Sequence, residues 1–279
     1  MTAPPFRLVA VDLDGTLLNP EKRIADRDRE AIARVARLGV AVAVISGRRF
    51  AELEELTTSL PQTAFRAGHG GALIRRNGRT ILEAPLSRTA ARRALEATAG
   101  MELISLISER DGAVRIRAAD PGDPRVRRYL AQVRPQPRLE PAPRIRRPPL
   151  HLVFVGSITE CRRARRRVGD RVGAGTPAAS AALEMTEYPD DGFALLDVIR
   201  ADAGKGPALV RIAAEIGADP EETLAIGDNW NDLGMLRAAG LGVLMGNAAP
   251  ELHELGFPVT ASNRAAGVAE ALDRLIPAG

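Results

Sequence analysis

The sequence predicts an α/β protein, in which helices cover both faces of a parallel sheet and an α+β module interrupts the chain. Two continuous apolar runs, residues 6–11 and 40–45, are typical of buried strands. Each is followed by a segment with helical spacing of its apolar residues, 27–38 and 50–60. Strands and helices that alternate in this way favour a parallel sheet, because each crossover lays a helix on one face.

The ends of the first two helices are marked in the sequence. Apolar residues at Ile32, Val35 and Leu38 share one face of the first helix, and Gly39 follows as a stop signal. The second helix is expected to end before Pro61, since proline cannot continue a helix.

The middle of the chain follows another pattern. Residues 86–100 have the spacing of a helix, 113–117 alternate like a half-buried strand, and six prolines between 135 and 149 mark a loop. Three elements follow: a strand at 150–155, an Arg-rich helix at 159–172 and a strand at 182–186. This mixture predicts an α+β domain with antiparallel strands.

Two proline-containing segments are interpreted as linkers, at 84–85 and 188–192. They predict a core domain made of residues 1–83 and 190–279, with the inserted cap domain at 84–189. The first pattern is expected to resume after the second linker, with strands at 193–199, 223–226 and 241–245 and helices at 205–216, 233–239 and 265–275.

Composition narrows the class of protein. With 279 residues, 45% of them hydrophobic and 27% charged, the chain is typical of a globular protein. The N-terminus lacks the features of a signal peptide, and no apolar run is long enough for a membrane span, so we expect a cytoplasmic protein without membrane contact. Cys161 is the only cysteine, and the three histidines show no metal-ligand spacing, so thiolate and histidine metal sites are not expected.

The basic residues are almost all arginine. The net charge of +4 favours anionic ligands, yet only Lys22 and Lys205 are lysines. A lysine retained against this bias points to a need for a compact ammonium, and Lys205 is interpreted in this way, whereas Lys22 is interpreted as accidental. The arginine cluster at 162–167 has no interleaved aromatic residues, so a solvated helix face is favoured over nucleic-acid binding.

Polar residues follow three of the predicted strands. Asp12 and Asp14 end the first, Ser46 the second, and Asp228 the strand at 223–226. The carboxyl ends of parallel strands line one crevice, so these side chains are expected to meet there. Asp232 would share one helical face with Asp228 if this segment is helical.

Four carboxylates in one crevice repel one another unless a divalent cation compensates them, and all-oxygen ligands indicate Mg²⁺. Two alternatives remain open: Ser46 as a cap of the following helix, and Asp232 as a capping residue rather than a ligand.

Four segments in order resemble the motifs of the haloacid dehalogenase superfamily of phosphotransferases. Residues 12–16 (DLDGT) match the first motif, 45–48 (ISGR) the second, Lys205 the third and 227–232 (GDNWND) the fourth. The long insert and the tail from 246 to 272 resemble the Cof-like subfamily with an α/β (type IIB) cap. The resemblance covers nearly the whole chain and implies a doubly wound, Rossmann-like core sheet.

The resemblance also implies roles for these residues. Asp12 would attack phosphorus, and Asp14 would act as acid and then base, with a pKa raised relative to that of Asp12. Magnesium would be held by Asp12, the Asp14 backbone carbonyl, Asp228 and Asp232. Ser46, Lys205 and Asn231 would bind the phosphoryl group. Possible substrate contacts are Gly47, Arg48, His69 and Trp230, with Gly70 standing where relatives commonly carry asparagine.

The function that follows is a magnesium-dependent phosphatase of small phosphorylated metabolites, with sugar phosphates favoured, acting as a monomer or weak homodimer. The alternatives are a phosphomutase or a dedicated sugar-phosphate phosphatase, such as a mannosyl-3-phosphoglycerate phosphatase-like enzyme. A non-catalytic phosphate-binding module ranks third, because both Asp12 and Asp14 are present.

Overall fold

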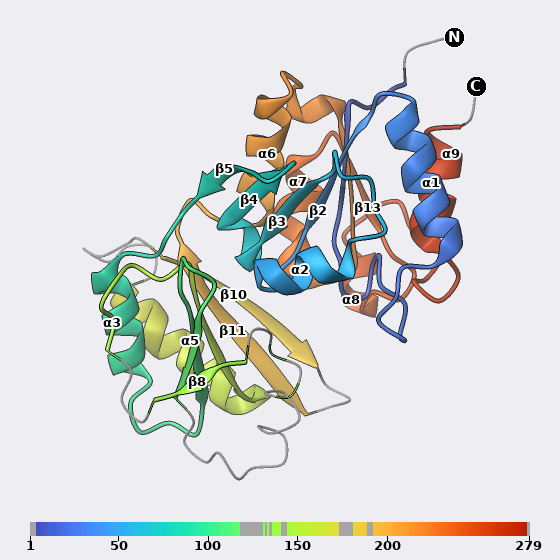
Figure 1. Cartoon of the computed structure of the whole chain (residues 1–279). Coiled ribbons are helices and arrows are strands. Elements are labelled where there is room, and N and C mark those ends of the chain that lie inside the picture. The colour runs from blue at the N-terminus through green and yellow to red at the C-terminus, as the bar shows by residue number, and fades with distance from the viewer. Residues whose placement is uncertain are drawn as a thin grey trace. The chain divides into compact units, whose positions relative to one another are not determined.

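The computed structural model describes residues 4–117, 131, 133, 136–140, 144–172, 181–188 and 192–277. The chain forms two compact units (Figure 1). Unit 1 comprises Met1–Arg48, Glu52–Leu82 and Lys205–Gly279, and unit 2 comprises Arg49–Ala51 and Glu83–Gly204.

Unit 1 is built on a seven-stranded sheet in the order β13-β12-β1-β2-β3-β4-β5. Its strands are β1 (Leu8–Val11), β2 (Ala41–Ile45), β3 (Phe65–Gly68), β4 (Leu73–Arg76), β5 (Arg79–Glu83), β12 (Thr223–Gly227) and β13 (Leu241–Leu244). The pairs from β13 to β3 are parallel, and β4 runs antiparallel to β3. The predicted α/β class with a parallel-rich core sheet is confirmed.

Helices cover both faces of this sheet (Figure 1). They are α1 (Asp26–Arg37), α2 (Phe50–Leu56), α6 (Lys205–Glu215), α7 (Leu233–Ala238), α8 (Pro250–His253) and α9 (Gly267–Leu275), with short 3₁₀ turns η1 (His69–Gly71), η2 (Pro220–Glu222) and η3 (Trp230–Asp232). Val9 and Val11 pack in one cluster with α1 and α9, while Leu8 and Ala10 pack in the other with α6 and α7. Because both sets are buried, β1 is a continuous apolar run rather than an alternating one.

Unit 2 contains a six-stranded sheet in the order β10-β11-β9-β6-β7-β8. Its strands are β6 (Ile104–Ser108), β7 (Val114–Arg117), β8 (Arg138–Leu139), β9 (His151–Ser157), β10 (Ala181–Tyr188) and β11 (Phe193–Arg200). The pairs are antiparallel except for β7 with β8. Helices α3 (Arg88–Ala97) and α5 (Ile158–Val172) bury their apolar stripes against the strands, so the inserted domain has the expected α+β architecture.

The second domain boundary differs from the predicted one. The sequence places residues 193–199 in the core sheet, whereas β11 pairs with β10 and β9 in the sheet of unit 2. Residues 188–192 therefore join two neighbouring strands rather than two units; positions 189–191 lie outside the described residues. The chain returns to unit 1 at Lys205, and the first boundary lies at Leu82, one residue before the expected one.

An apolar strand shows burial but not which sheet it joins, which explains the error over β11. Strands β3 to β6 had no counterpart in the sequence prediction either. Helix α2 ends at Leu56, four residues before the predicted end, because residues 57–59 form a turn instead. In the described part of the chain, no helix has the combined length and apolar character needed to cross a bilayer.

Candidate active site

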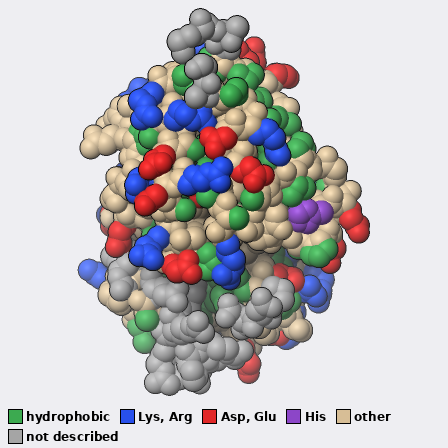
Figure 2. Space-filling model, turned by 90° about the vertical axis from the view of Figure 1, so that its right-hand side faces the viewer, with side chains coloured by type: hydrophobic (Ala, Val, Ile, Leu, Met, Phe, Trp, Pro, Cys, Tyr) green, Lys and Arg blue, Asp and Glu red, His purple; other side chains and the backbone are tan. Residues whose placement is uncertain are grey.

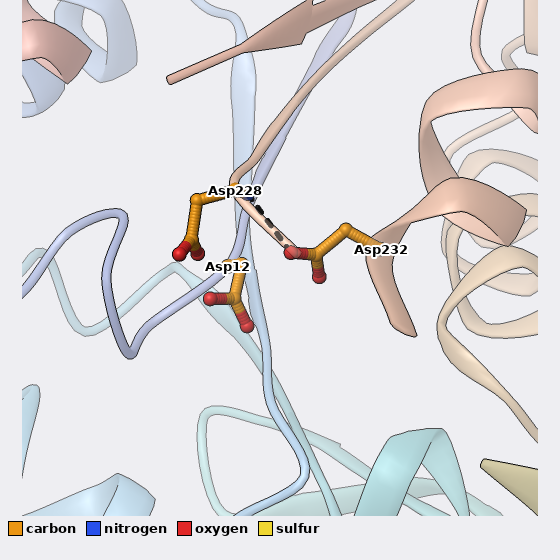
Figure 3. Close-up of side chains that lie close together, drawn as sticks. All are labelled: Asp12, Asp228 and Asp232. Carbon is orange, nitrogen blue, oxygen red and sulfur yellow. Dashed lines mark hydrogen bonds between the residues drawn. The ribbon is translucent and has the colours of Figure 1, made fainter. Parts of the chain in front are cut away.

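Two of the side chains predicted from strand ends, Asp12 and Asp228, meet at the carboxyl edge of the core sheet. Asp12 follows β1, Asp228 follows β12, and Asp232 ends the turn η3. One oxygen of each of these three carboxylates lies within 4.8 Å of the others (Figure 3). The sharp turn after Asp12 requires Gly15, whose φ is +81° and where a Cβ would lie 2.2 Å from Oδ2 of Asp228.

Lys205 neutralises part of this charge. It is the first residue of α6 and only 2% exposed. Its Nζ donates to Oδ1 of Asp12 at 2.6 Å and to Oδ1 of Asp232 at 2.5 Å, with Oδ1 of Asn231 at 3.4 Å. Burial opposes the charged form, but the two carboxylates outweigh it and raise the pKa of Lys205.

The three carboxylates together carry more negative charge than the single ammonium of Lys205 can neutralise. Burial, followed by the Asp232 carboxylate, raises the pKa of Asp12 to about 7. Burial also raises the pKa of Asp228 well above its ordinary value, and Asp12 and Asp232 add to the rise. A divalent cation would relieve this repulsion, and the donor set, carboxylate oxygens only, suits a hard cation. The described residues thus contain a group that can hold a metal, made of Asp12, Asp228 and Asp232.

Asp232 has the bonds of a capping residue as well. Its Oδ2 accepts hydrogen bonds from the backbone N–H groups of Asp228 and Asn229, both at 3.0 Å, while its Oδ1 accepts from Lys205. Figure 3 shows the first of these bonds as a dashed line. The segment is a loop and a 3₁₀ turn rather than an α-helix, so the predicted shared helical face is replaced by this cap. Asp232 therefore orders the turn that carries Asp228.

Asp14 has different partners. Arg48 donates to both of its oxygens, from Nε to Oδ2 at 2.5 Å and from Nη2 to Oδ1 at 2.7 Å, and Lys22 Nζ donates to Oδ1 at 3.0 Å. Burial alone would raise the pKa of Asp14, but the bonds from Arg48, with Lys22, lower it to about 2. The expected order, with the pKa of Asp14 above that of Asp12, is therefore reversed in the protein alone.

Ser46 connects two loops of the site. It is 2% exposed, and its Oγ accepts from the backbone N–H of Arg48 at 3.1 Å. Its carbonyl accepts from Gly70, and the Arg48 carbonyl accepts from His69. The turn η1 thus docks on the loop after β2, with left-handed φ values at His69 and Gly70 of +54° and +63°. Glycine accommodates this conformation easily, which gives a reason for Gly70 in this chain.

The remaining predicted contacts are more open. Trp230 lies on η3 beside Asn231 and is 50% exposed. A Cβ added at Gly47 would have no neighbour within 4 Å. Half of the Trp230 residue is accessible, and its role as a substrate contact stays a prediction.

Four residues contribute to the site without having been predicted. Thr16 is fully buried and donates from Oγ1 to Oδ1 of Asp228 at 2.9 Å. Asn247 donates to the Gly15 carbonyl and Asn263 to the Leu18 carbonyl, each at 2.8 Å. Lys22 is the fourth. Thr16 had a signal, since it belongs to the first motif; the asparagines are more than 200 residues away along the chain.

Surface charge agrees with the predicted solvated face of α5. Arg162 pairs with Glu187 through two 2.7 Å bonds, and Arg163 pairs with Glu160. On the face shown in Figure 2, the coloured basic and acidic side chains are interspersed. A basic stripe, as expected of a surface that follows a nucleic-acid backbone, is not seen among the described side chains of that face.

A family model described as haloacid dehalogenase-like hydrolase matches residues 9–272. The chain is 28% identical to 5-amino-6-(5-phospho-D-ribitylamino)uracil phosphatase YwtE of Bacillus subtilis (strain 168), over 97% of this chain and 98% of that protein. A haloacid dehalogenase-like hydrolase from Bacteroides thetaiotaomicron superposes with a TM-score of 0.77 at 26% identity, covering 97% of this chain and 100% of that one.

A second solved structure, the HAD subclass IIB sugar phosphatase BT4131, shares the fold. Its TM-score is 0.78 at 18% identity, covering 96% of this chain and 98% of that one. The family model spans nearly the whole chain, including the four motif segments and the inserted unit 2. The chain therefore belongs to the haloacid dehalogenase-like hydrolase family, among its Cof-like phosphatases.

Proposed function

We propose that this protein is a magnesium-dependent phosphatase that hydrolyses small phosphorylated metabolites through an aspartyl-phosphate intermediate. The observation that carries the proposal is the position of Asp12. Its carboxylate is bonded to the buried ammonium of Lys205 and lies beside Asp228, at the carboxyl edge of a parallel sheet. Such an edge is where open α/β sheets bind ligands.

The proposed reaction has two displacements at phosphorus. In the first, an Asp12 oxygen forms a bond to phosphorus while the bond to the leaving oxygen breaks, and Asp14 gives that oxygen its proton. In the second, a water oxygen attacks phosphorus while Asp14 takes the proton of the water. The bond between phosphorus and Asp12 then breaks, and its electron pair returns to the Asp12 carboxylate.

The cation is assigned to side chains that the geometry already groups. Asp12 and Asp228 would hold Mg²⁺, together with the Asp14 backbone carbonyl, and Asp232 would act by ordering the turn of Asp228. When bound, the ion would neutralise the charge between an anionic nucleophile and an anionic phosphate. Ser46, Lys205 and Asn231 would bind the phosphoryl oxygens.

Asp14 as paired here suits the second displacement. Its two oxygens accept from Arg48 and Lys22, which favour the charged form that can take a proton. For the first displacement it must carry a proton. An entering phosphate is an anion that competes for Arg48, and a proton on Oδ2 of Asp14 leaves Oδ1 to accept from Lys22.

For the substrate we propose phosphorylated metabolites of the size of sugar phosphates, selected by unit 2 as a cap. The relative YwtE is a phosphatase of a phosphorylated ribitylaminouracil, and BT4131 is a sugar phosphatase. Exchanging residues 83–203 for the corresponding segment of a relative is expected to change the ranking of substrates. An unchanged ranking in a folded chimera would show that unit 2 does not select them.

The proposal is tested by screening phosphorylated metabolites with Mg²⁺ and with chelator, using wild-type protein and Asp12→Asn. An amide cannot form the aspartyl-phosphate, so kcat is expected to fall by several orders of magnitude. Asp26→Asn is the matched control, because Asp26 is exposed on α1 and should leave turnover unchanged. Turnover by Asp12→Asn above about a tenth of wild type would refute the nucleophile.

A further inference from the structure

Each of the two lysines of this arginine-rich chain donates a hydrogen bond to an aspartate of the first motif. Lys205 bonds Asp12, and Lys22 Nζ lies 3.0 Å from Oδ1 of Asp14. The sequence gives reason to interpret only Lys205 as functional. The structure removes that distinction, because each lysine of the chain serves one carboxylate of the pair.

The backbone of Lys22 is strained in the turn that places its side chain beside Asp14. Its φ is +57°, a left-handed backbone conformation that residues with a Cβ rarely adopt. The turn is closed by the Lys22 N–H bonded to the Asn19 carbonyl and by the Arg23 N–H bonded to Oδ1 of Asn19. Strained conformations persist where the surroundings fix them, and they cluster at functional sites.

Stability does not account for Lys22. Its side chain is 59% exposed and that of Asp14 is 29% exposed, and ion pairs this open contribute little to folding. What the contact does is geometric. Arg48, in the loop after β2, donates to both oxygens of Asp14, and Lys22 donates to Oδ1 from a separate loop, so donors from two loops fix the carboxylate.

We propose that Lys22 is a positioning residue that orients the Asp14 carboxylate toward the leaving oxygen of the substrate. The proposal rests on the proposed phosphatase function, in which Asp14 exchanges a proton with that oxygen. A misplaced proton donor slows the hydrolysis of substrates with basic leaving groups. It leaves the rate unchanged for substrates whose leaving group departs without a proton. Leaving-group dependence is thus a readout that a purely structural role would not move.

The test uses Lys22→Asn with two probes of similar size. Phenyl phosphate releases a phenolate whose conjugate acid has a pKa of about 10, as in tyrosine, and para-nitrophenyl phosphate releases a much weaker base. We expect kcat/KM, which reports the steps up to formation of the aspartyl-phosphate, to fall about 10- to 100-fold for phenyl phosphate and to change by less than about threefold for para-nitrophenyl phosphate. Asparagine tolerates the left-handed conformation, so the melting temperature should be equal or higher.

Arg23→Asn is the matched control. It removes a positive charge from the same turn, but no bond to Asp14, and should leave both rates unchanged. Equal losses for both probes, no loss for either, or a lower melting temperature of Lys22→Asn would each overturn the positioning role. If wild-type protein hydrolyses neither probe nor any screened metabolite, the proposed function fails and this inference with it. If wild-type protein is active and Lys22→Asn has the same ratio of rates for the two probes as wild type, the inference is rejected while the proposed function stands.

Discussion

Replacing Lys205 by arginine should be far from conservative. The Lys205 Nζ is surrounded by three acceptor oxygens, on Asp12, Asp232 and Asn231, at 2.6, 2.5 and 3.4 Å. An ammonium turns three N–H donors toward such a set, whereas a guanidinium is a larger planar fork. Because the residue is only 2% exposed, the added atoms have no solvent to enter.

The size of the effect of Lys205→Arg follows from the larger volume of arginine and from its different donor geometry. Overpacking a buried site costs about 1–3 kcal/mol of unfolding free energy. Loss of a preorganised donor at the reacting group lowers kcat by about 10²–10³. Lys205→Met, which leaves Asp12 and Asp232 buried without their counter-charge, should be less stable still, by about 3–5 kcal/mol relative to wild type. Urea unfolding in chelator and kcat with the best substrate of the screen measure both quantities.

Arg37→Lys is the control, because Arg37 is exposed at the end of α1 and the reverse exchange there should change neither quantity. The reasoning is refuted if Lys205→Arg keeps kcat within about threefold of wild type, since a donor in contact with the reacting group cannot be exchanged so cheaply. It is also refuted if Lys205→Met is as stable as wild type, since two buried carboxylates would then need no partner.

Three further predictions concern other parts of the chain. Asp28 is buried on α1 and accepts from the backbone N–H of Ala269 in the first turn of α9, so Asp28→Ala should lower the unfolding free energy by about 1–2 kcal/mol. Asp28→Asn, which keeps an acceptor, should lose less, and equal losses would exclude a capping role. Burial raises the pKa of Cys161 to about 12, so a thiol reagent at pH 8 should label it only after unfolding; rapid native labelling would contradict its burial. Trp230, the only tryptophan, should change its fluorescence saturably when Mg²⁺ and a phosphate mimic bind, and calorimetry showing equal binding of the mimic in chelator would rule out the metal-bridged site.

The sequence predicted the site better than the fold around it. Asp12 and Asp228 could be placed together because parallel strands share one carboxyl edge, and this needs only the strand ends to be recognised. Strand β11 was placed in the wrong sheet because its apolar run reports burial and not pairing partners. The turn that presents Lys22 had no signal either, since a left-handed lysine is visible only in the backbone.

The pKa order of the two motif aspartates was out of reach for a related reason. Only Leu13 separates Asp12 from Asp14, yet their partners come from positions 205 and 232 for one and 22 and 48 for the other. A pKa depends on which charges the fold brings near, and spacing along the chain does not contain that information. The Asn247 and Asn263 braces were missed for the same reason, because they reach the first loop from the other end of the chain.

The return of the chain to unit 1 has a consequence for protein engineering. The crossing lies between Gly204 and Lys205, so the last peptide bond of unit 2 leads directly into helix α6, which begins with Lys205. Gly204 has a φ of +135°, which only glycine adopts readily. Any chimera that exchanges unit 2 therefore has its downstream splice next to the buried ammonium of Lys205, and it should carry Gly204 with the core. The upstream splice at Leu82 falls inside β5, so both junctions of a library that varies substrate range lie at or within ordered elements of unit 1.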